Sequence, residues 1–313
     1  MPNETVHPPS TTDAALETPP AAPAAAPTAT PATPATPATP ATPATPATPA
    51  TRTISCEMRT SAPPEHAFAA WAEPERIAHW FVDRAFGDVR PGGVMTWVFE
   101  KFGYEIPYPV LEVKPPEKLV LGGEIPGWPP FRLEITITRD GGETVVRLFN
   151  SGFRDGAQWD EEYQGVASGW RMSLAILRQY LEAHYGTPKR SVLVLRPATF
   201  DYAAVLPWFT DPAKLSRWLT RSGAIGAPGE RAELVLQSGT TVRGTVLDVT
   251  HQEAAVSWDD ENLALELKAF TMGPQRMVAI RATGWGVSDD RMRALETELD
   301  GAIARLAEAI SSG

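Results

Sequence analysis

The segment WAEPERIAHWF (residues 71–81) has a counterpart in FTDPAKLSRWL (residues 209–219), which begins 138 residues further along the chain. Further pairs match in the same order at offsets that fall from 137 to 132: RPGGVMTWVF (90–99) with APGERAELVL (227–236), VLEV (110–113) with VLDV (246–249), LEI (133–135) with LEL (265–267), and NSGF (150–153) with ATGW (282–285). Chance matches would scatter, whereas an offset that only falls indicates a second copy with shorter loops. We therefore interpret residues 53–187 and 188–313 as a tandem duplication.

Each copy begins with a strand-like run, Thr53–Arg59 or Ser191–Arg196, which two short helices are expected to follow. A proline near the start of each second helix, Pro74 or Pro212, suits that position because the missing N–H is not needed there. Asp211 is a good N-cap. Strand-like segments separated by Gly- and Pro-rich turns come next in the first copy: Val94–Phe99, Val110–Val113, Lys118–Leu121, Phe131–Thr138 and Thr144–Asn150.

A long amphipathic helix is expected to close each copy. Apolar residues recur there at spacings of three and four: Val166, Trp170, Leu174, Leu177 and Leu181 in the first, and Met292, Leu295, Leu299, Ile303, Leu306 and Ile310 in the second. Nothing else in either copy is long enough to cover the apolar face of a sheet. The pattern predicts two α+β domains, each an antiparallel sheet packed on its C-terminal helix.

Residues 1–52 have a different composition. They hold 14 of the 31 prolines, and the triplet PAT is repeated seven times from Pro31 to Thr51. Such a segment buries too little apolar surface to offset the entropy lost on ordering, so we expect a disordered tail. A spacer or a docking strand for a proline-binding module is the functional alternative.

Charge and cysteine content exclude several classes of protein. A net charge of −10 argues against a nucleic-acid-binding protein, which would carry a basic face. Cys56 is the only cysteine, so neither an intramolecular disulfide nor a cysteine-built zinc site is possible, and the histidine spacings predict no metal site. No apolar run approaches the roughly 18 residues of a membrane span, and the N-terminus lacks a secretory signal. We expect a cytoplasmic protein without a cofactor.

Several motifs of the first copy occur together in a known family: Ala70-Trp71-Ala72-Glu73-Pro74 with Trp80-Phe81, Arg90-Pro91-Gly92-Gly93, the run from Val110 to Leu119, Ser151-Gly152-Phe153, and Gly169-Trp170 at the expected start of the last helix. With them, residues 53–185 resemble the START-like (SRPBCC) superfamily, and within it the family named for the C-terminal domain of the heat-shock protein 90 ATPase activator. The second copy looks like a diverged member, because it has Glu230 in place of the second glycine and lacks the Gly-Trp pair.

The resemblance implies a helix-grip fold, in which a curved antiparallel sheet wraps around the long C-terminal helix and often leaves an apolar cavity. It does not imply one activity, because relatives include carriers of hydrophobic ligands, cyclases and co-chaperone-like domains.

The expected cavity has a candidate aromatic wall. Residues on one face of the alternating strands, Trp170 on the apolar face of the long helix, and Asn150 are the candidates for ligand binding. The full set is Met95, Trp97, Phe99, Phe131, Leu133, Asn150 and Trp170. The alternative interpretation of these side chains is a filled core, since large aromatic residues dominate cores. The second copy has Ala232, Leu234 and Leu299 at the positions of Met95, Trp97 and Trp170, and so offers no matching wall.

Two polar features bear on catalysis. Relatives commonly carry histidine at the position of Asn150, and asparagine cannot transfer a proton near neutral pH; it could instead satisfy backbone groups at the strand end. Asp160, Glu161 and Glu162 precede the expected helix, where such acidic runs usually complement the helix dipole rather than act as acid and base.

Three hypotheses for function follow. The first is a non-catalytic protein whose first domain holds a small hydrophobic molecule. The second is a co-chaperone-like module whose partner is a heat-shock ATPase or another protein, although residues 1–52 offer no counterpart of the activators' N-terminal partner-binding domain. The third is a cyclase- or hydratase-type enzyme, which the absent histidine disfavours.

Overall fold

The computed structural model describes residues 51–124 and 130–312. The predicted tail, residues 1–52, lies outside the described residues except for Thr51 and Arg52. These two residues pair with Arg154 and Phe153, so the first strand starts two residues earlier than we expected. Its start is anchored because the Arg52 guanidinium donates to Asp160 Oδ1 at 2.5 Å and stacks over the Tyr163 ring.

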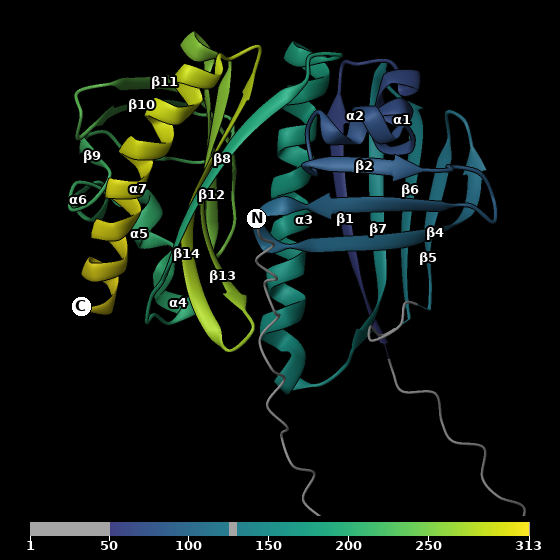
Figure 1. Ribbon diagram of the computed structural model, residues 1–313, viewed down its shortest axis with the longest axis horizontal. Coiled ribbons are helices and arrows are strands. Elements are labelled where there is room, and N and C mark those ends of the chain that lie inside the picture. The colour runs from purple at the N-terminus through teal and green to yellow at the C-terminus, as the bar shows by residue number, and fades with distance from the viewer. Residues whose placement is uncertain (1–50, 125–129, 313) are drawn as a thin grey trace, which may run out of the picture. The chain divides into compact units, whose positions relative to one another are not determined.

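The strands form two antiparallel sheets of seven strands each (Figure 1). The first has the order β1-β7-β6-β5-β4-β3-β2, built from β1 (Thr51–Thr60), β2 (Arg84–Gly87), β3 (Val94–Phe99), β4 (Tyr104–Lys114), β5 (Lys118–Gly123), β6 (Phe131–Asp140) and β7 (Glu143–Arg154). The second has the order β8-β14-β13-β12-β11-β10-β9, built from β8 (Lys189–Pro197), β9 (Thr220–Ser222), β10 (Arg231–Leu236), β11 (Thr241–Val249), β12 (Glu253–Trp258), β13 (Leu263–Met272) and β14 (Gln275–Trp285).

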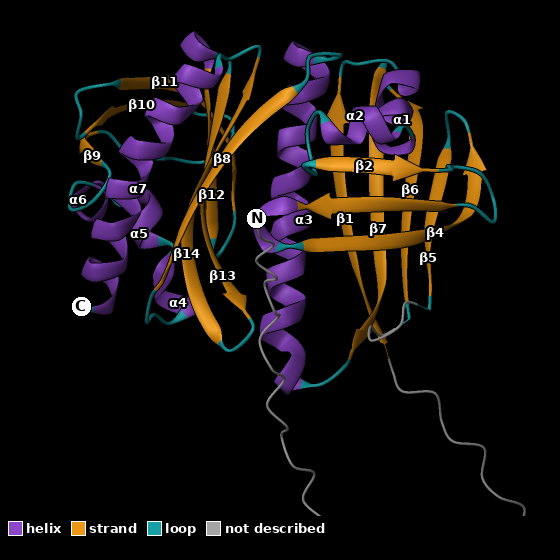
Figure 2. Cartoon of the chain, viewed as in Figure 1, coloured by secondary structure: helices purple, strands orange, loops and turns teal. Residues whose placement is uncertain are grey.

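Short helices follow the first strand of each sheet, and a long helix follows the last (Figure 2). The short ones are α1 (Pro64–Ala72) and α2 (Pro74–Ala78), then α4 (Tyr202–Val205), α5 (Pro207–Thr210) and α6 (Pro212–Leu215). The long ones are α3 (Asp160–Gln179) and α7 (Asp289–Ser311). Pro74 and Pro212 occupy the first turns of their helices, and Asp211 caps α6 by accepting from Ala213 N and Lys214 N, as predicted.

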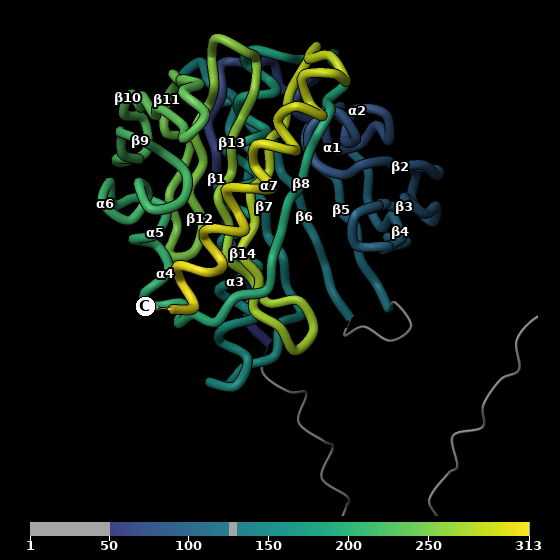
Figure 3. The backbone as a smooth tube through the Cα atoms, turned by 60° about the vertical axis from the view of Figure 1, so that its left-hand side comes forward, coloured from purple at the N-terminus to yellow at the C-terminus, as the bar shows by residue number. Residues whose placement is uncertain are grey.

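The long helices lie in layers with the sheets. One side of α3 packs on β1, and another side contacts β11, β12 and β13 of the second sheet (Figure 1). The second long helix, α7, packs on β8 and β14 (Figure 3). Each sheet with its helix encloses a hydrophobic core, and the second core contains all six predicted apolar residues of α7. The two antiparallel sheets and their helices fit an α+β fold of the helix-grip type.

Three local expectations need correction. Asp160, Glu161 and Glu162 form the first turn of α3 rather than the loop before it, where their charges favour the helix dipole. Gly169-Trp170 therefore lies in the middle of the helix and does not open it. Three short helices instead of two follow β8, because α4 ends before Pro207, which begins α5, and the extended backbone of Asp211 separates α5 from α6.

Candidate ligand-binding site

A cavity of about 420 Å³ lies between the first sheet and the N-terminal half of α3. Strands β4, β6 and β7 supply one wall, and the start of α3 supplies the other; the lining residues are Ile106, Tyr108, Phe131, Asn150, Ser151, Gly152, Phe153, Arg154, Trp159, Glu162, Val166 and Trp170. Its volume falls in the range of small-molecule sites, and a lining of apolar and aromatic side chains with some polar groups is typical of them. We call this space the grip cavity.

Trp170 and Asn150 form the polar contact at the back of the grip cavity. The Trp170 indole Nε1 donates to Asn150 Oδ1 at 2.9 Å, and Asn150 Nδ2 donates to the Arg132 carbonyl oxygen at 3.2 Å. The Trp170 ring also stacks on Phe81, with centroids 5.5 Å apart. Asn150 thus satisfies a strand backbone group, as one interpretation proposed, and also fixes the orientation of the indole.

A β-bulge at Gly152 turns Phe153 toward the grip cavity. Strand β1 pairs Arg52 with Phe153 but Thr53 with Ser151, so Gly152 is the extra residue. Gly152 has a φ of +105°, and a Cβ added at this position would lie only 2.3 Å from the Pro130 carbonyl oxygen. Only glycine therefore fits here without a shift of the backbone. Phe153 then packs edge-on against Tyr163 of α3, with centroids 5.7 Å apart.

Tyr108 and Ile106 are lining residues that the sequence analysis missed. They lie in the first half of β4, where Pro107 and Pro109 obscured the strand signal, although Ile106, Tyr108 and Val110 alternate with those prolines. The Tyr108 ring packs against Trp97 and Phe131, with centroids 4.4 Å and 5.0 Å away. Burial raises the pKa of the Tyr108 hydroxyl, so this group of a cavity-lining residue remains a protonated donor.

The wall near the start of α3 carries charged side chains. The Arg154 guanidinium lies over the Trp159 ring, 4.5 Å from its centroid, and Glu162 lines the cavity beside them. The other two acidic residues of the helix start are engaged elsewhere, since Asp160 accepts from Arg52 and Glu161 accepts from Arg276. The acidic triplet is therefore not a paired acid and base.

The structure brings three of the seven predicted residues to the grip cavity: Phe131, Asn150 and Trp170. Met95, Trp97 and Leu133 are 0%, 1% and 1% exposed and lie in the core behind it. Trp97 packs between Phe81 and Tyr108, which explains why it supports the cavity wall without lining it.

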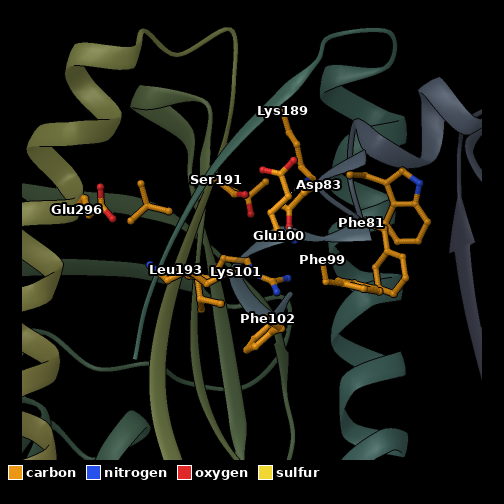
Figure 4. A pocket seen from close by; sticks show the side chains of 14 residues that line it. Phe81, Asp83, Phe99, Glu100, Lys101, Phe102, Lys189, Ser191, Leu193 and Glu296 are labelled. Carbon is orange, nitrogen blue, oxygen red and sulfur yellow. Dashed lines mark hydrogen bonds and ion pairs between the residues drawn. The ribbon is translucent and has the colours of Figure 1, made fainter. Parts of the chain in front are cut away.

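The seventh residue, Phe99, lines a second cavity of about 230 Å³ (Figure 4). We call it the lysine cavity, because Lys189 of β8 lines it beside Asp83. Its walls combine Trp80, Phe81, Phe99, Glu100 and Phe102 with residues of β8 and β14.

Residues 51–124 and 130–312 contain no group of three or more His, Cys, Asp or Glu side chains arranged to hold a metal ion. No helix in this part of the chain is long and apolar enough to cross a membrane.

Comparison with solved structures finds chains of low identity. CalU16 from Micromonospora echinospora is 26% identical, with 42% of this chain and 78% of that chain covered and a TM-score of 0.35. The Aha1 dimer from Colwellia psychrerythraea is 17% identical, with 43% and 99% covered and a TM-score of 0.38. DynU16, a putative protein in the dynemicin biosynthetic locus, is 18% identical, with 82% and 98% covered and a TM-score of 0.37.

Comparison with curated proteins finds no match. A family model described as "Activator of Hsp90 ATPase homolog 1-like protein" matches residues 61–182, a range that ends just after α3. The chain therefore contains, at residues 61–182, a domain similar to that family.

Proposed function

We propose that this chain binds a small hydrophobic molecule in the grip cavity without transforming it. The observation that carries the proposal is the 420 Å³ space lined by seven apolar or aromatic side chains: Ile106, Tyr108, Phe131, Phe153, Trp159, Val166 and Trp170. Burial of a ligand's apolar surface against these side chains supplies the affinity.

The polar lining groups select the orientation of the ligand. The Tyr108 hydroxyl donates to an acceptor, while Arg154 and Glu162 contact a polar end near the start of α3. Asn150 is already bonded to Trp170 and Arg132 and has no proton to exchange near neutral pH. We infer recognition rather than acid–base catalysis, because the polar group at the back of the cavity is an amide that cannot transfer a proton.

We also propose that the two sheet-and-helix units arose by duplication, with domains at 53–187 and 188–313. Besides the shared strand order, both units repeat one internal hydrogen bond: Trp80 Nε1 donates to the Ala70 carbonyl, and Trp218 Nε1 donates to the Trp208 carbonyl, both at 2.9 Å. The two pairs lie 138 residues apart, as the sequence offset requires.

A second candidate function is docking to a heat-shock ATPase, which the description of the matched family suggests. An exposed apolar patch favours it: Phe86, Val94 and Leu111 are 48%, 42% and 46% exposed on the face of β2–β4 opposite to the core residues Met95 and Trp97. Patches of this kind mark interaction sites. Stimulation of ATP hydrolysis by heat-shock protein 90, and its loss in Phe86→Glu, is the test.

Native mass spectrometry of the purified full chain tests the first candidate. We expect a co-purified small molecule in the wild type and its loss in Asn150→Leu, which leaves the Trp170 indole without its acceptor and fills space beside it. Leu299→Met, a volume-conserving change in the second core, is the matched control and should keep the molecule. Equal occupancy in folded wild type and Asn150→Leu would contradict the proposal.

A further inference from the structure

The lysine cavity places one amine against an aromatic wall. Lys189 is the first residue of β8, and its side chain is 6% exposed. Ser191 and Leu193 follow on the same side of the strand, while Phe81 and Phe99 lie on the opposite wall (Figure 4). The lysine cavity and the grip cavity share no lining residue. They are connected through one contact, in which Phe81 of the first stacks on Trp170 of the second.

Within residues 51–124 and 130–312, the Lys189 amine makes one ion pair, a long one with Asp83. Its Nζ lies 3.9 Å from Asp83 Oδ1, which is longer than a hydrogen bond, and Asp83 Oδ2 accepts from the Glu100 backbone N–H at 2.8 Å. Five charged or titratable groups, each from a different part of the fold, interact electrostatically with the amine: His79, Asp83, Glu100, Glu266 and Arg281. Burial lowers the pKa of Lys189 to about 8, and Arg281 acts in the same direction.

We propose that Lys189 is a nucleophilic amine that forms an imine with a small aromatic aldehyde or ketone bound in the lysine cavity. The geometry supplies the three requirements: a buried amine that lines a cavity, an aromatic wall for the ring, and a carboxylate near the reacting nitrogen. A volume of about 230 Å³ lies below the usual range of drug-sized sites, so the ligand is limited to about one ring with its carbonyl group.

The reaction balances without an oxidant or reductant. The nitrogen lone pair attacks the carbonyl carbon and forms the C–N bond, while the C=O π electrons move to oxygen, which takes a proton from nitrogen. The carbinolamine hydroxyl then takes a proton and leaves as water, while the nitrogen lone pair forms the C=N bond. The second proton of the nitrogen is released and replaces the one that the hydroxyl took. Asp83 Oδ1 is placed to pass these protons. One amine and one carbonyl compound give one imine and one water.

Reductive trapping tests the proposal on the full chain. The protein is treated with benzaldehyde and sodium cyanoborohydride at pH 7, and benzylation of the six lysines (101, 114, 118, 189, 214 and 268) is measured by peptide mass mapping. We expect Lys189 to react at least about 10-fold faster than Lys101, because burial lowers the pKa of its amine and the amine faces the aromatic wall of the cavity. Lys101 lies at the same cavity and is the internal reference.

Two variants sharpen the result. Lys189→Met should remove the dominant adduct, whereas Lys114→Met, at an exposed side chain that does not line the lysine cavity, should leave it unchanged. The rate at Lys189 should also rise through about pH 8 and level off roughly one pH unit higher, where most of its amine is neutral. Labelling of Lys189 no faster than Lys101 in the wild-type protein would overturn the proposal, and that comparison does not depend on either variant folding.

Discussion

Strands β7 and β14 occupy matching places in the two units, but β7 contains a bulge that shifts its register by one residue and β14 does not. The matching aromatic residue therefore lines a cavity in the first unit and lies on a contact surface in the second. In β7 the bulge at Gly152 turns Phe153 to the same side as Asn150, so Phe153 lines the grip cavity. In β14 the pairing with β8 is regular from Ala282 to Trp285, so Trp285 points away from α7. There its Nε1 donates to the His79 carbonyl at 2.8 Å, and its ring stacks on His184.

The comparison shows how one fold gives two outcomes. A one-residue shift in a strand exchanges its two faces, so the same aromatic position serves either the inside of a unit or its outside. The residues opposite reinforce the difference, because Asn150 and Trp170 are bonded to each other, whereas the matching Ala282 and Leu299 are both 1% exposed and apolar. The first unit keeps a cavity beside its helix, and the second fills the matching positions with buried aliphatic side chains.

The largest effect should come from the aromatic residue that supports the cavity wall. Trp97→Ala removes a fully buried side chain that contacts Phe81 and Tyr108, and should lower the free energy of unfolding by about 3–5 kcal/mol. Urea denaturation measures this loss. A cost below about 1 kcal/mol would mean that Trp97 is not a core residue and that the grip cavity extends to it.

The bulge can be broken directly with Gly152→Ala. The new Cβ would lie 2.3 Å from the Pro130 carbonyl oxygen at a φ of +105°, so we expect a loss of about 2–3 kcal/mol. Gly141→Ala is the matched control, since its φ is also positive but nothing lies within 4 Å of its Cβ; its cost should be about 1 kcal/mol. Equal costs would show that Gly152 is not under the constraint described.

The buried carboxylate of Glu266 in β13 should make the free energy of unfolding depend on pH. Burial alone would raise the pKa of Glu266, but Lys268 and Arg281 outweigh it and hold the pKa below its usual value. The folded state therefore binds this proton less readily than the unfolded chain, so the contribution of Glu266 is present above the unfolded pKa and is lost as pH falls through the folded one. Glu266→Gln should cost about 2 kcal/mol at pH 7, and thermal melts at pH 7 and pH 3 should show that this difference shrinks in acid.

The smallest effect should come from the N-terminal segment. Deleting residues 1–50 while keeping Thr51 and Arg52, which pair with β7, should change the melting temperature by less than about 2 °C. The expectation rests on the proline- and alanine-rich composition. A drop of several degrees in a calorimetric scan would show that this segment contributes to stability.

Periodicity predicted most of the elements, and the matched offsets predicted the similar order of the two units. The long helices were evident because their apolar residues follow a spacing of three and four. The candidate site was harder to predict, since the bulge at Gly152 depends on the approach of Pro130, which lies far from it in sequence. Alternation also cannot tell whether Trp97 lines a cavity or fills the core behind Tyr108. These outcomes depend on three-dimensional packing, which local patterns do not contain.

Fluorescence titration of the full chain with 8-anilinonaphthalene-1-sulfonate tests the central claim most directly. The anionic, aromatic probe suits a cavity lined by Trp170 and Arg154, and we expect saturable binding with quenching of tryptophan emission. Trp170→Leu, which gives the first unit the residue of the second, should weaken binding at least about tenfold, equivalent to about 1.4 kcal/mol. Leu299→Met should leave the affinity unchanged. Unchanged probe affinity in a folded Trp170→Leu variant would contradict ligand binding in the grip cavity.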